Sequence, residues 1–321
     1  MTDPILLSAR NVKKYYPIKK KGKSALVKAV DDVSLDIIKG ETFGVVGESG
    51  CGKSTLGKVL LRLEELTHGT VHYAGENLIN LSKPGLKAFR KKAQIIYQDP
   101  FSALNPKKKI GAAIEEPLII HGLGNQRFRR DKVLGLMDKV GLRPEHRDRY
   151  PHEFSGGQRQ RIIIARALAV GPEFILADEP VSALDVSIQA QVINLLKDLK
   201  QDQDLTFLFI SHDLSVVEHI CDRLAVMYLG RIVETGPVED FFKTPFHPYS
   251  RALIDAVPVT DPSIALHRTI LEGDVPSPIN PPSGCHFHPR CIFRQDRCKE
   301  TTPTLRDLSP DRQVACHFPL A

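Results

Sequence analysis

The chain has 321 residues, 42% of them hydrophobic, and a formal net charge of +6. This composition can build a large core, and the length exceeds one ordinary domain. The modest charge argues against a nucleic-acid-binding protein, and the lack of a run of eighteen uncharged apolar residues argues against a channel. Since the first twenty residues lack the apolar core of a secretion signal, we expect a cytosolic protein.

The first segment with a clear chemical meaning lies at residues 41–54. Residues 41–46 are typical of a short buried strand, and residues 55–63 have apolar side chains at helical spacing. Between them is the phosphate-loop pattern G-x-x-x-x-G-K-S, in which glycines let backbone N–H groups point at a phosphate chain. Lys53 can reach the β- and γ-phosphates, and Ser54 can offer its hydroxyl to Mg²⁺. The pattern predicts an ATP site formed by Gly47, Glu48, Ser49, Gly50, Cys51, Gly52, Lys53, Ser54 and Thr55.

The middle of the chain, residues 98–158, has helical patterns, such as the one over residues 130–140. It begins at Gln98 and ends with the sequence Phe-Ser-Gly-Gly-Gln at residues 154–158. A helix is predicted to follow over residues 158–169, which places two glycines directly before its first turn.

Two carboxylates follow an apolar segment that begins at Phe174, which predicts a strand ending at the edge of a parallel sheet. Asp178 is expected to hold Mg²⁺ through its water shell, and Glu179 to polarise the water that attacks the γ-phosphate. A surface or helix-capping role for Glu179 is the alternative. A second apolar strand is predicted at residues 205–210, with His212 just after it.

Taken in order, these motifs resemble those of the ATP-binding subunits of ABC transporters, over residues 5 to about 255. Residues 154–158 are similar to the family signature LSGGQ, with Phe in place of Leu, and residues 182–185 resemble its D-loop, which ends at Asp185. Gln98 and His212 resemble the Q-loop glutamine and the switch histidine of the family.

The resemblance implies a head-to-tail dimer of ATPase domains, in which the signature of one subunit covers the ATP held by the other. The signature residues are Ser155, Gly156, Gly157 and Gln158. It implies that His212 bonds the γ-phosphate and holds Glu179 and water in line, and that Gln98 touches the metal or the water. The family also stacks an aromatic side chain on adenine; of Tyr15 and Tyr16, we choose Tyr16.

The fold class implied by this resemblance is α/β, of the P-loop NTPase type. It combines a RecA-like parallel sheet with an antiparallel β subdomain and an inserted helical subdomain at about residues 98–158. Residues 1–257 are expected to form this ATPase domain, and residues 258–321 a small cysteine-containing extension.

The last part of the chain narrows the resemblance. His247-Pro-Tyr249, the run of residues 273–278 and Val181 resemble the ATPases of dipeptide and oligopeptide importers, most of all the second ATPase of a dipeptide permease. Such a subunit normally pairs with a different ATPase subunit.

Four of the six cysteines lie near the end, namely Cys285, Cys291, Cys298 and Cys316. Disulfides are improbable in the cytosol, so spaced thiolates indicate a metal or an iron–sulfur cluster. The spacing leaves zinc, [4Fe-4S] and free thiols open, with His286, His288 and His317 as alternative ligands. The resemblance implies [4Fe-4S]. Cys51 and Cys221 are interpreted as small packing residues.

These resemblances predict an ATPase that energises uptake of dipeptides or oligopeptides in a prokaryote, on the cytoplasmic face of the cell membrane. The implied partners are a second ATPase subunit, two transmembrane permeases and, indirectly, an extracytoplasmic solute-binding protein. The turn-rich residues 99–106 and 115–117 are the predicted docking surface for the permeases.

Two alternatives share parts of this pattern. The same motor could serve another solute, such as nickel or glutathione. A non-transport ABC ATPase would share every catalytic motif, but the chain lacks the tandem ATPase halves and long coiled coil expected of one. A purely regulatory metal-binding protein would predict a broken catalytic set, whereas Lys53, Asp178, Glu179 and His212 are all present.

Overall fold

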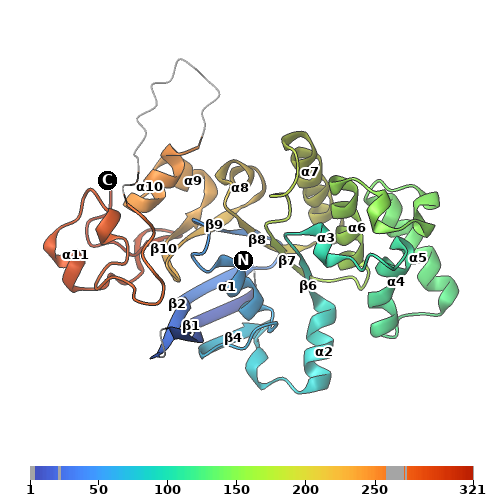
Figure 1. Ribbon diagram of the computed structural model, residues 1–321, viewed down its shortest axis with the longest axis horizontal. Helices are drawn as coiled ribbons and strands as arrows, with labels where there is room; N and C mark the ends of the chain where they lie inside the picture. Colours follow the sequence, from blue (N-terminus) through green and yellow to red (C-terminus); the bar gives the residue numbers. More distant parts are fainter. Residues whose placement is uncertain (1–3, 21–22, 258–270, 272, 321) are drawn as a thin grey trace, which may run out of the picture. The chain divides into compact units, whose positions relative to one another are not determined.

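The computed structural model describes residues 4–20, 23–257, 271 and 273–320. The chain separates into two compact units. The first unit consists of Met1–Ile79 and Ser211–Ala321, and the second of Asn80–Ile210. Strands and helices occur in both (Figure 1).

An antiparallel sheet in the order β2-β1-β4-β5 belongs to the first unit. Its strands are β1 (Ile5–Lys20), β2 (Lys23–Ile38), β4 (His68–Tyr73) and β5 (Glu76–Asn77). Leu7 of β1 pairs with Ile37 of β2. Both side chains are fully buried, since residues that pair across two strands point to the same face of the sheet. The β1–β2 register is interrupted near Asn11, which has a φ of 48°.

The other strands of the first unit follow the order β11-β12-β10-β9-β3. Their bounds are β3 (Thr42–Val46), β9 (Arg223–Tyr228), β10 (Arg231–Pro237), β11 (Arg306–Ser309) and β12 (Arg312–Val314). β3 runs parallel to β9 and is buried along its whole length, as expected for a parallel strand covered on both faces. The strand predicted at 41–46 is confirmed, with its start at Thr42.

The first unit also contains short helices. They are α1 (Lys53–Leu60), the 3-10 turn η1 (Leu78–Asn80) at its boundary, α8 (Leu214–Ile220), α9 (Val238–Lys243), α10 (Pro248–Asp255), the 3-10 turn η4 (His288–Arg290) and α11 (Asp296–Glu300). The helix predicted to reach residue 63 ends at Leu60. Arg62 lies in the left-handed region with a φ of 52°, and a right-handed helix cannot continue through that conformation.

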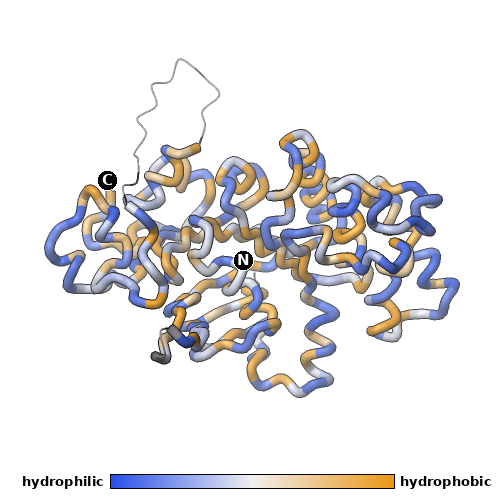
Figure 2. Tube along the Cα trace, viewed as in Figure 1, coloured by the Kyte–Doolittle hydropathy of each residue, from blue (hydrophilic) through white to orange (hydrophobic). Residues whose placement is uncertain are grey.

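Three parallel strands, in the order β8-β7-β6, form the sheet region of the second unit. They are β6 (Ala93–Ile96), β7 (Phe174–Asp178) and β8 (Thr206–Ser211), whose last residue belongs to the first unit. Every residue of β7 and β8 is buried, and the middle of the tube in Figure 2, where these strands lie, is coloured mainly as hydrophobic. The predicted strand after residue 174 is confirmed, and the one at 205–210 is shifted by one residue.

The helices of the second unit agree with the predicted helical character of the middle of the chain. They are α2 (Lys83–Lys92), α3 (Pro100–Ala103), α4 (Ile110–Ile120), α5 (Gln126–Lys139), η2 (Pro144–Asp148), η3 (Pro151–Glu153), α6 (Gly156–Leu168) and α7 (Val186–Gln203). α6 begins two residues before the predicted start at 158 because Ser155 caps it.

Parallel and antiparallel strands with covering helices confirm the α/β class. The predicted domain bounds, 1–257 and 258–321, stay a prediction, and residues 258–270 lie outside the described residues. Among the described helices, none is both long enough and apolar enough to cross a membrane.

Candidate functional site

The phosphate loop connects β3 to α1 in the first unit. Gly47, Gly50 and Gly52 have φ values of 150°, 79° and 108°, which side chains rarely adopt. A Cβ atom on Gly52 would lie 2.0 Å from the Ala29 carbonyl oxygen, so only glycine fits there. No side chain caps α1, which leaves its first-turn N–H groups to face an anion.

Lys53 is buried at the start of α1 and bends back over the loop. Its Nζ donates to the Gly47 carbonyl oxygen at 2.8 Å and to the Glu48 carbonyl oxygen at 3.1 Å. Ser49 lies exposed at the tip of the loop, whereas Cys51 is 3% exposed, and burial raises the pKa of its thiol. Cys51 is therefore a packing residue, as predicted. Lys53 is held in position by its hydrogen bonds to the loop carbonyl oxygens.

The structure separates the two tyrosines considered for adenine stacking. The Tyr15 hydroxyl donates to the Asp31 carboxylate, which also accepts from Arg231 Nη2 at 2.8 Å. Burial and that hydrogen bond raise the pKa of Tyr15. Lys14 lies over the Tyr16 ring, with its Nζ 4.7 Å from the centroid. The Tyr15 side chain is thus used in a structural contact, and Tyr16 remains the candidate for stacking on adenine.

In the second unit, the predicted acids lie at the end of β7, and Asp178 is 4% exposed. Glu179 follows in the left-handed region, with a φ of 48°, a strained conformation for this residue type. Its N–H donates to the Ile210 carbonyl oxygen at 3.0 Å. Its Oε2 accepts from Gln98 Nε2 at 2.9 Å. The structure therefore brings Gln98 and Glu179 together, 81 positions apart in the sequence.

The signature segment begins α6. Ser155 Oγ accepts from the Gln158 N–H at 3.3 Å, and Gln158 Oε1 accepts from the Ser155 N–H at 3.1 Å, which completes a capping box. A Cβ atom on Gly157 would lie 2.4 Å from Ile188 Cγ2 of α7, whereas one on Gly156 would only reach ordinary contact. Asp185 of the predicted D-loop is the N-cap residue of α7, and its side chain makes no capping hydrogen bond.

His212 lies exposed in the turn between β8 and α8. The turn is fixed locally, since Ser211 Oγ accepts from the Asp213 N–H at 3.0 Å and Asp213 caps α8. The predicted site residues are divided between the units. The first unit holds Tyr16, the phosphate loop and His212, and the second holds Gln98, Asp178, Glu179, the signature and Asp185.

The four C-terminal cysteines line one small cavity with a volume of about 10 Å³, which is about the space of a single water molecule. Burial, together with the neighbouring thiols, raises the pKa of Cys285 to about 11 and that of Cys316 to about 12. Across the described part of the chain, no three His, Cys, Asp or Glu side chains are arranged to hold a metal ion. The cysteines gather as predicted, but the structure does not show a ligand geometry.

The nearby histidines already bond to main-chain oxygens. His288 Nδ1 lies 2.9 Å from the Cys285 carbonyl oxygen, and His317 Nε2 lies 2.8 Å from that of Thr301. His286 Nδ1 is 3.3 Å from the Leu229 carbonyl oxygen and lines a different cavity.

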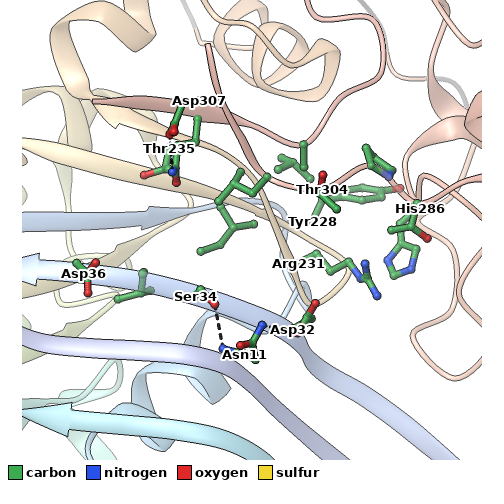
Figure 3. A pocket seen from close by; sticks show the side chains of 18 of the residues that line it. Asn11, Asp32, Ser34, Asp36, Tyr228, Arg231, Thr235, His286, Thr304 and Asp307 are labelled. Atoms are coloured by element: carbon green, nitrogen blue, oxygen red, sulfur yellow. Dashed lines mark hydrogen bonds between the residues drawn. The ribbon is translucent and has the colours of Figure 1, made fainter. Parts of the chain in front are cut away.

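That other cavity has a volume of about 840 Å³, and the phosphate loop is not among its lining residues. Figure 3 shows Arg231 and His286 on one side of it and Asn11 and Ser34 on the strands below. Its arginines have carboxylate partners: Arg10 pairs with Asp36, Arg223 with Glu41 and Arg231 with Asp31. Paired charges of this kind tie the strands together and do not identify a ligand.

Two residues that contact the phosphate loop were missed as site residues in the sequence. The Tyr249 hydroxyl accepts from the Glu48 N–H at 2.9 Å, and Arg290 forms an ion pair with the Glu48 carboxylate at 2.7 Å. The His247-Pro-Tyr249 motif indicated the resemblance to peptide-importer ATPases, but not the contact of Tyr249 with the phosphate loop. Nothing in the sequence around Arg290 indicated its contact.

Comparison with known proteins gives a consistent result. Residues 30–182 match the family model described as ABC transporter, and residues 233–298 match the one described as oligopeptide/dipeptide transporter, C-terminal region. The dipeptide transport ATP-binding protein DppF of Haemophilus influenzae is 52% identical over 97% of this chain and 96% of its own length. The oligopeptide transport ATP-binding protein AppF of Bacillus subtilis is also 52% identical, over 98% and 97%.

A solved structure supports the fold independently. The dimeric post-hydrolysis state of the ATP-binding cassette MJ0796, bound to ADP and Pi, aligns with a TM-score of 0.65 at 30% identity. The alignment covers 73% of this chain and 99% of that one.

Proposed function

Because the chain belongs to the ABC transporter ATP-binding subunits, in the oligopeptide/dipeptide branch, we propose that it hydrolyses ATP to energise the uptake of dipeptides or oligopeptides. The observation that carries this proposal is the near full-length similarity to DppF and AppF, which includes the C-terminal region as well as the ATPase motifs. An ABC transporter subunit of this kind acts on MgATP.

The residues divide the chemistry as follows. Lys53 and the loop N–H groups bind the phosphates, with Gly47, Glu48, Ser49, Gly50, Cys51, Gly52, Ser54 and Thr55 around them. Glu179 orients and deprotonates the attacking water, and Gln98, which bonds its carboxylate at 2.9 Å, keeps that carboxylate in place. His212 bonds the γ-phosphate, and Tyr16 stacks on adenine.

Mg²⁺ neutralises phosphate charge when bound, and the hydroxyl, amide and carboxylate oxygens of Ser54, Gln98 and Asp178 are ligand types that suit it. The signature residues Ser155 to Gln158 and Asp185 act on the ATP of a second subunit. Since Ser155 Oγ and the first N–H groups of α6 lie together at one helix end, they form a donor set for a γ-phosphate.

The partners are a second, different ATPase subunit, two transmembrane permeases and an extracytoplasmic solute-binding protein. The subunit binds peripherally at the cytoplasmic face of the membrane. Large side chains exposed on the second unit near the predicted docking surface, Phe101 at 64% and Ile119 at 56%, support contact with a permease.

The four cysteines are proposed to hold a [4Fe-4S] cluster, with zinc as the alternative. Four thiols in one cavity are a suitable donor set, although the cavity must widen to admit a cluster. Anaerobically purified protein is expected to contain iron and sulfide at about four each per chain. Zinc at about one per chain without sulfide would replace this assignment.

Uptake of a labelled dipeptide tests the function. A strain deleted for this gene and for redundant importers is complemented with the wild type, with Glu179→Gln or with the control Glu173→Gln, an exposed carboxylate beside Lys92. We expect uptake from the wild type and the control alone, and ATPase activity of the Glu179→Gln complex reduced by about 10²- to 10⁴-fold. Unchanged dipeptide uptake in the deletion strain would reassign the cargo to nickel or another solute.

A further inference from the structure

One residue of the phosphate loop is held by the C-terminal part of the chain at both its main chain and its side chain. Arg290 forms two parallel hydrogen bonds to the Glu48 carboxylate, Nη1 to Oε2 at 2.7 Å and Nη2 to Oε1 at 3.1 Å. The Glu48 N–H donates to the Tyr249 hydroxyl at 2.9 Å. The N–H of Glu48 is therefore used inside the protein, which separates Glu48 from the loop residues whose N–H groups can face phosphate.

The Arg290 guanidinium is nearly buried, with 7% of the side chain exposed, against 28% for Glu48. A bidentate arginine–carboxylate pair fixes orientation as well as distance. Because the pair is shielded from water, removing one partner leaves the other without its partner in a poorly solvated site. The pair is thus a rigid connection, unlike an exposed surface ion pair.

The position of Arg290 depends on the cysteine-containing segment, residues 285–316. Arg290 ends η4, which lies between Cys285 and Cys291. The Cys285 carbonyl oxygen accepts from the His288 N–H at 3.0 Å, and the Cys285 N–H donates to the Cys298 carbonyl oxygen at 2.8 Å. The turn that carries Arg290 is therefore hydrogen-bonded to the main chain of Cys285, which in turn is bonded to that of Cys298.

A buried aromatic cluster connects the same turn to Tyr249. The Phe287 ring is 5.3 Å from the rings of both Tyr228 and Tyr249 and 5.6 Å from that of His247. All four side chains are at most 2% exposed. His247 Nδ1 accepts from the Tyr249 N–H at 3.0 Å and so fixes the first turn of α10. The cluster holds both supports of Glu48 in one packed body.

The contact reaches the lysine of the loop through one further bond. Lys53 Nζ donates to the carbonyl oxygens of Gly47 and Glu48, so a displaced Glu48 moves an acceptor of the amine that binds phosphate. We propose that Arg290 is a positioning residue, which acts through Glu48 to set the affinity of the phosphate loop for MgATP. It thereby makes that affinity dependent on the cysteine-containing segment. This inference rests on the proposed function, because MgATP is the ligand of the loop.

The test measures MgATP binding to the full-length chain at equilibrium, together with KM and kcat for ATP in the complex with its permeases. The variants are Arg290→Met, Arg290→Lys, Glu48→Gln and the double variant. The control is Arg294→Met, an exposed arginine of the same segment whose Nη1 donates to the Pro289 carbonyl oxygen at 3.1 Å. Thermal melts and circular dichroism report folding separately.

We expect Arg290→Met to raise Kd and KM by about tenfold, within the range of coupling found for residues of one ion-pair network. The value of kcat should stay within about twofold of the wild type, since Glu179 and Gln98 are untouched. Arg290→Lys should recover part of the loss, the double variant should be no worse than either single variant, and Arg294→Met should bind as the wild type does.

A folded Arg290→Met chain with unchanged Kd would overturn the inference, and so would an equal loss in Arg294→Met. If Arg290→Met does not fold, Glu48→Gln removes the same pair from the loop side, and unchanged Kd in that variant overturns the inference. Failure of the wild-type chain to bind MgATP would overturn the proposed function as well.

Discussion

The phosphate loop and the signature segment are both glycine-containing turns that lead into a helix, but they are held in different ways. The phosphate loop depends on distant residues, above all Arg290, which lies 242 positions from Glu48. The signature depends on a capping box within residues 155–158 and on α7 beside it. A short glycine motif can therefore be supported by the fold as a whole or almost entirely by itself.

This difference has a chemical reason. The phosphate loop needs left-handed backbone at Gly50 and Gly52, and such a conformation persists only when surrounding groups hold it. Gly156 and Gly157 are already helical, so their conformation needs no such support. We expect damage to the supports to affect MgATP binding by the chain itself and damage to the signature to leave it intact.

The largest expected effect comes from a methyl group added to the phosphate loop, compared with one added to the signature. Gly52→Ala forces a Cβ atom to 2.0 Å from a carbonyl oxygen at a φ of 108°, so MgATP binding should weaken by about 100-fold. Gly156→Ala places its Cβ atom 3.4 Å from Leu184 Cδ2, an ordinary contact, and should bind MgATP as the wild type does. Isothermal titration of both full-length variants measures this. Equal losses in the two variants would remove the distinction between the motifs.

Low pH provides a second way to compare the support of the phosphate loop with that of the signature. Burial lowers the pKa of His247 to about 3, so the folded chain keeps this histidine neutral while the unfolded chain protonates near its ordinary pKa. The stability it contributes is complete above about pH 6.5 and is lost as the pH falls toward 3. From pH 7 to pH 5 the free energy of unfolding should fall by about 2 kcal/mol from this group.

His247→Asn keeps an oxygen that can accept the Tyr249 N–H but removes the titration. Urea unfolding at pH 7 and pH 5 should therefore show a smaller loss in this variant than in the wild type. Hydrogen exchange at pH 5 should quicken in α10, which carries Tyr249, before it quickens in α6. An unchanged pH dependence in His247→Asn would contradict the assignment.

Removal of one hydroxyl group is the next smaller change. Tyr249→Phe keeps the ring in its cluster but leaves the Glu48 N–H without its acceptor, and an unmade buried hydrogen bond costs about 1–3 kcal/mol. We expect MgATP affinity to fall by about tenfold with kcat little changed. Tyr150→Phe, in the second unit near the signature, is the matched control and should leave affinity unchanged. If both variants bind MgATP equally well, the hydroxyl does not support the loop.

The same contrast explains which features of the site could be predicted from the sequence. The glycines of the loop and the acids at the end of β7 follow a local pattern, so their places in the fold were predicted correctly. The pairing of Glu48 with Arg290 depends on which distant surfaces meet when the chain folds, and no local pattern carries that information. The clustering of the cysteines was predicted from composition and spacing. Their ligand geometry could not be, because it depends on backbone positions to within fractions of an ångström.

The smallest expected effect concerns the signature itself. Ser155→Ala removes the side-chain cap of α6 and should lower the free energy of unfolding by about 1 kcal/mol. Ser82→Ala is a matched control, since Ser82 Oγ caps α2 of the same unit by accepting from the Gly85 N–H at 3.3 Å. Urea unfolding should show similar losses for both variants, and MgATP affinity should remain that of the wild type. In the assembled complex only Ser155→Ala should also slow ATP hydrolysis, because only Ser155 is proposed to contact the ATP of the neighbouring subunit. Equal hydrolysis by the two complexes would reduce Ser155 to a helix cap.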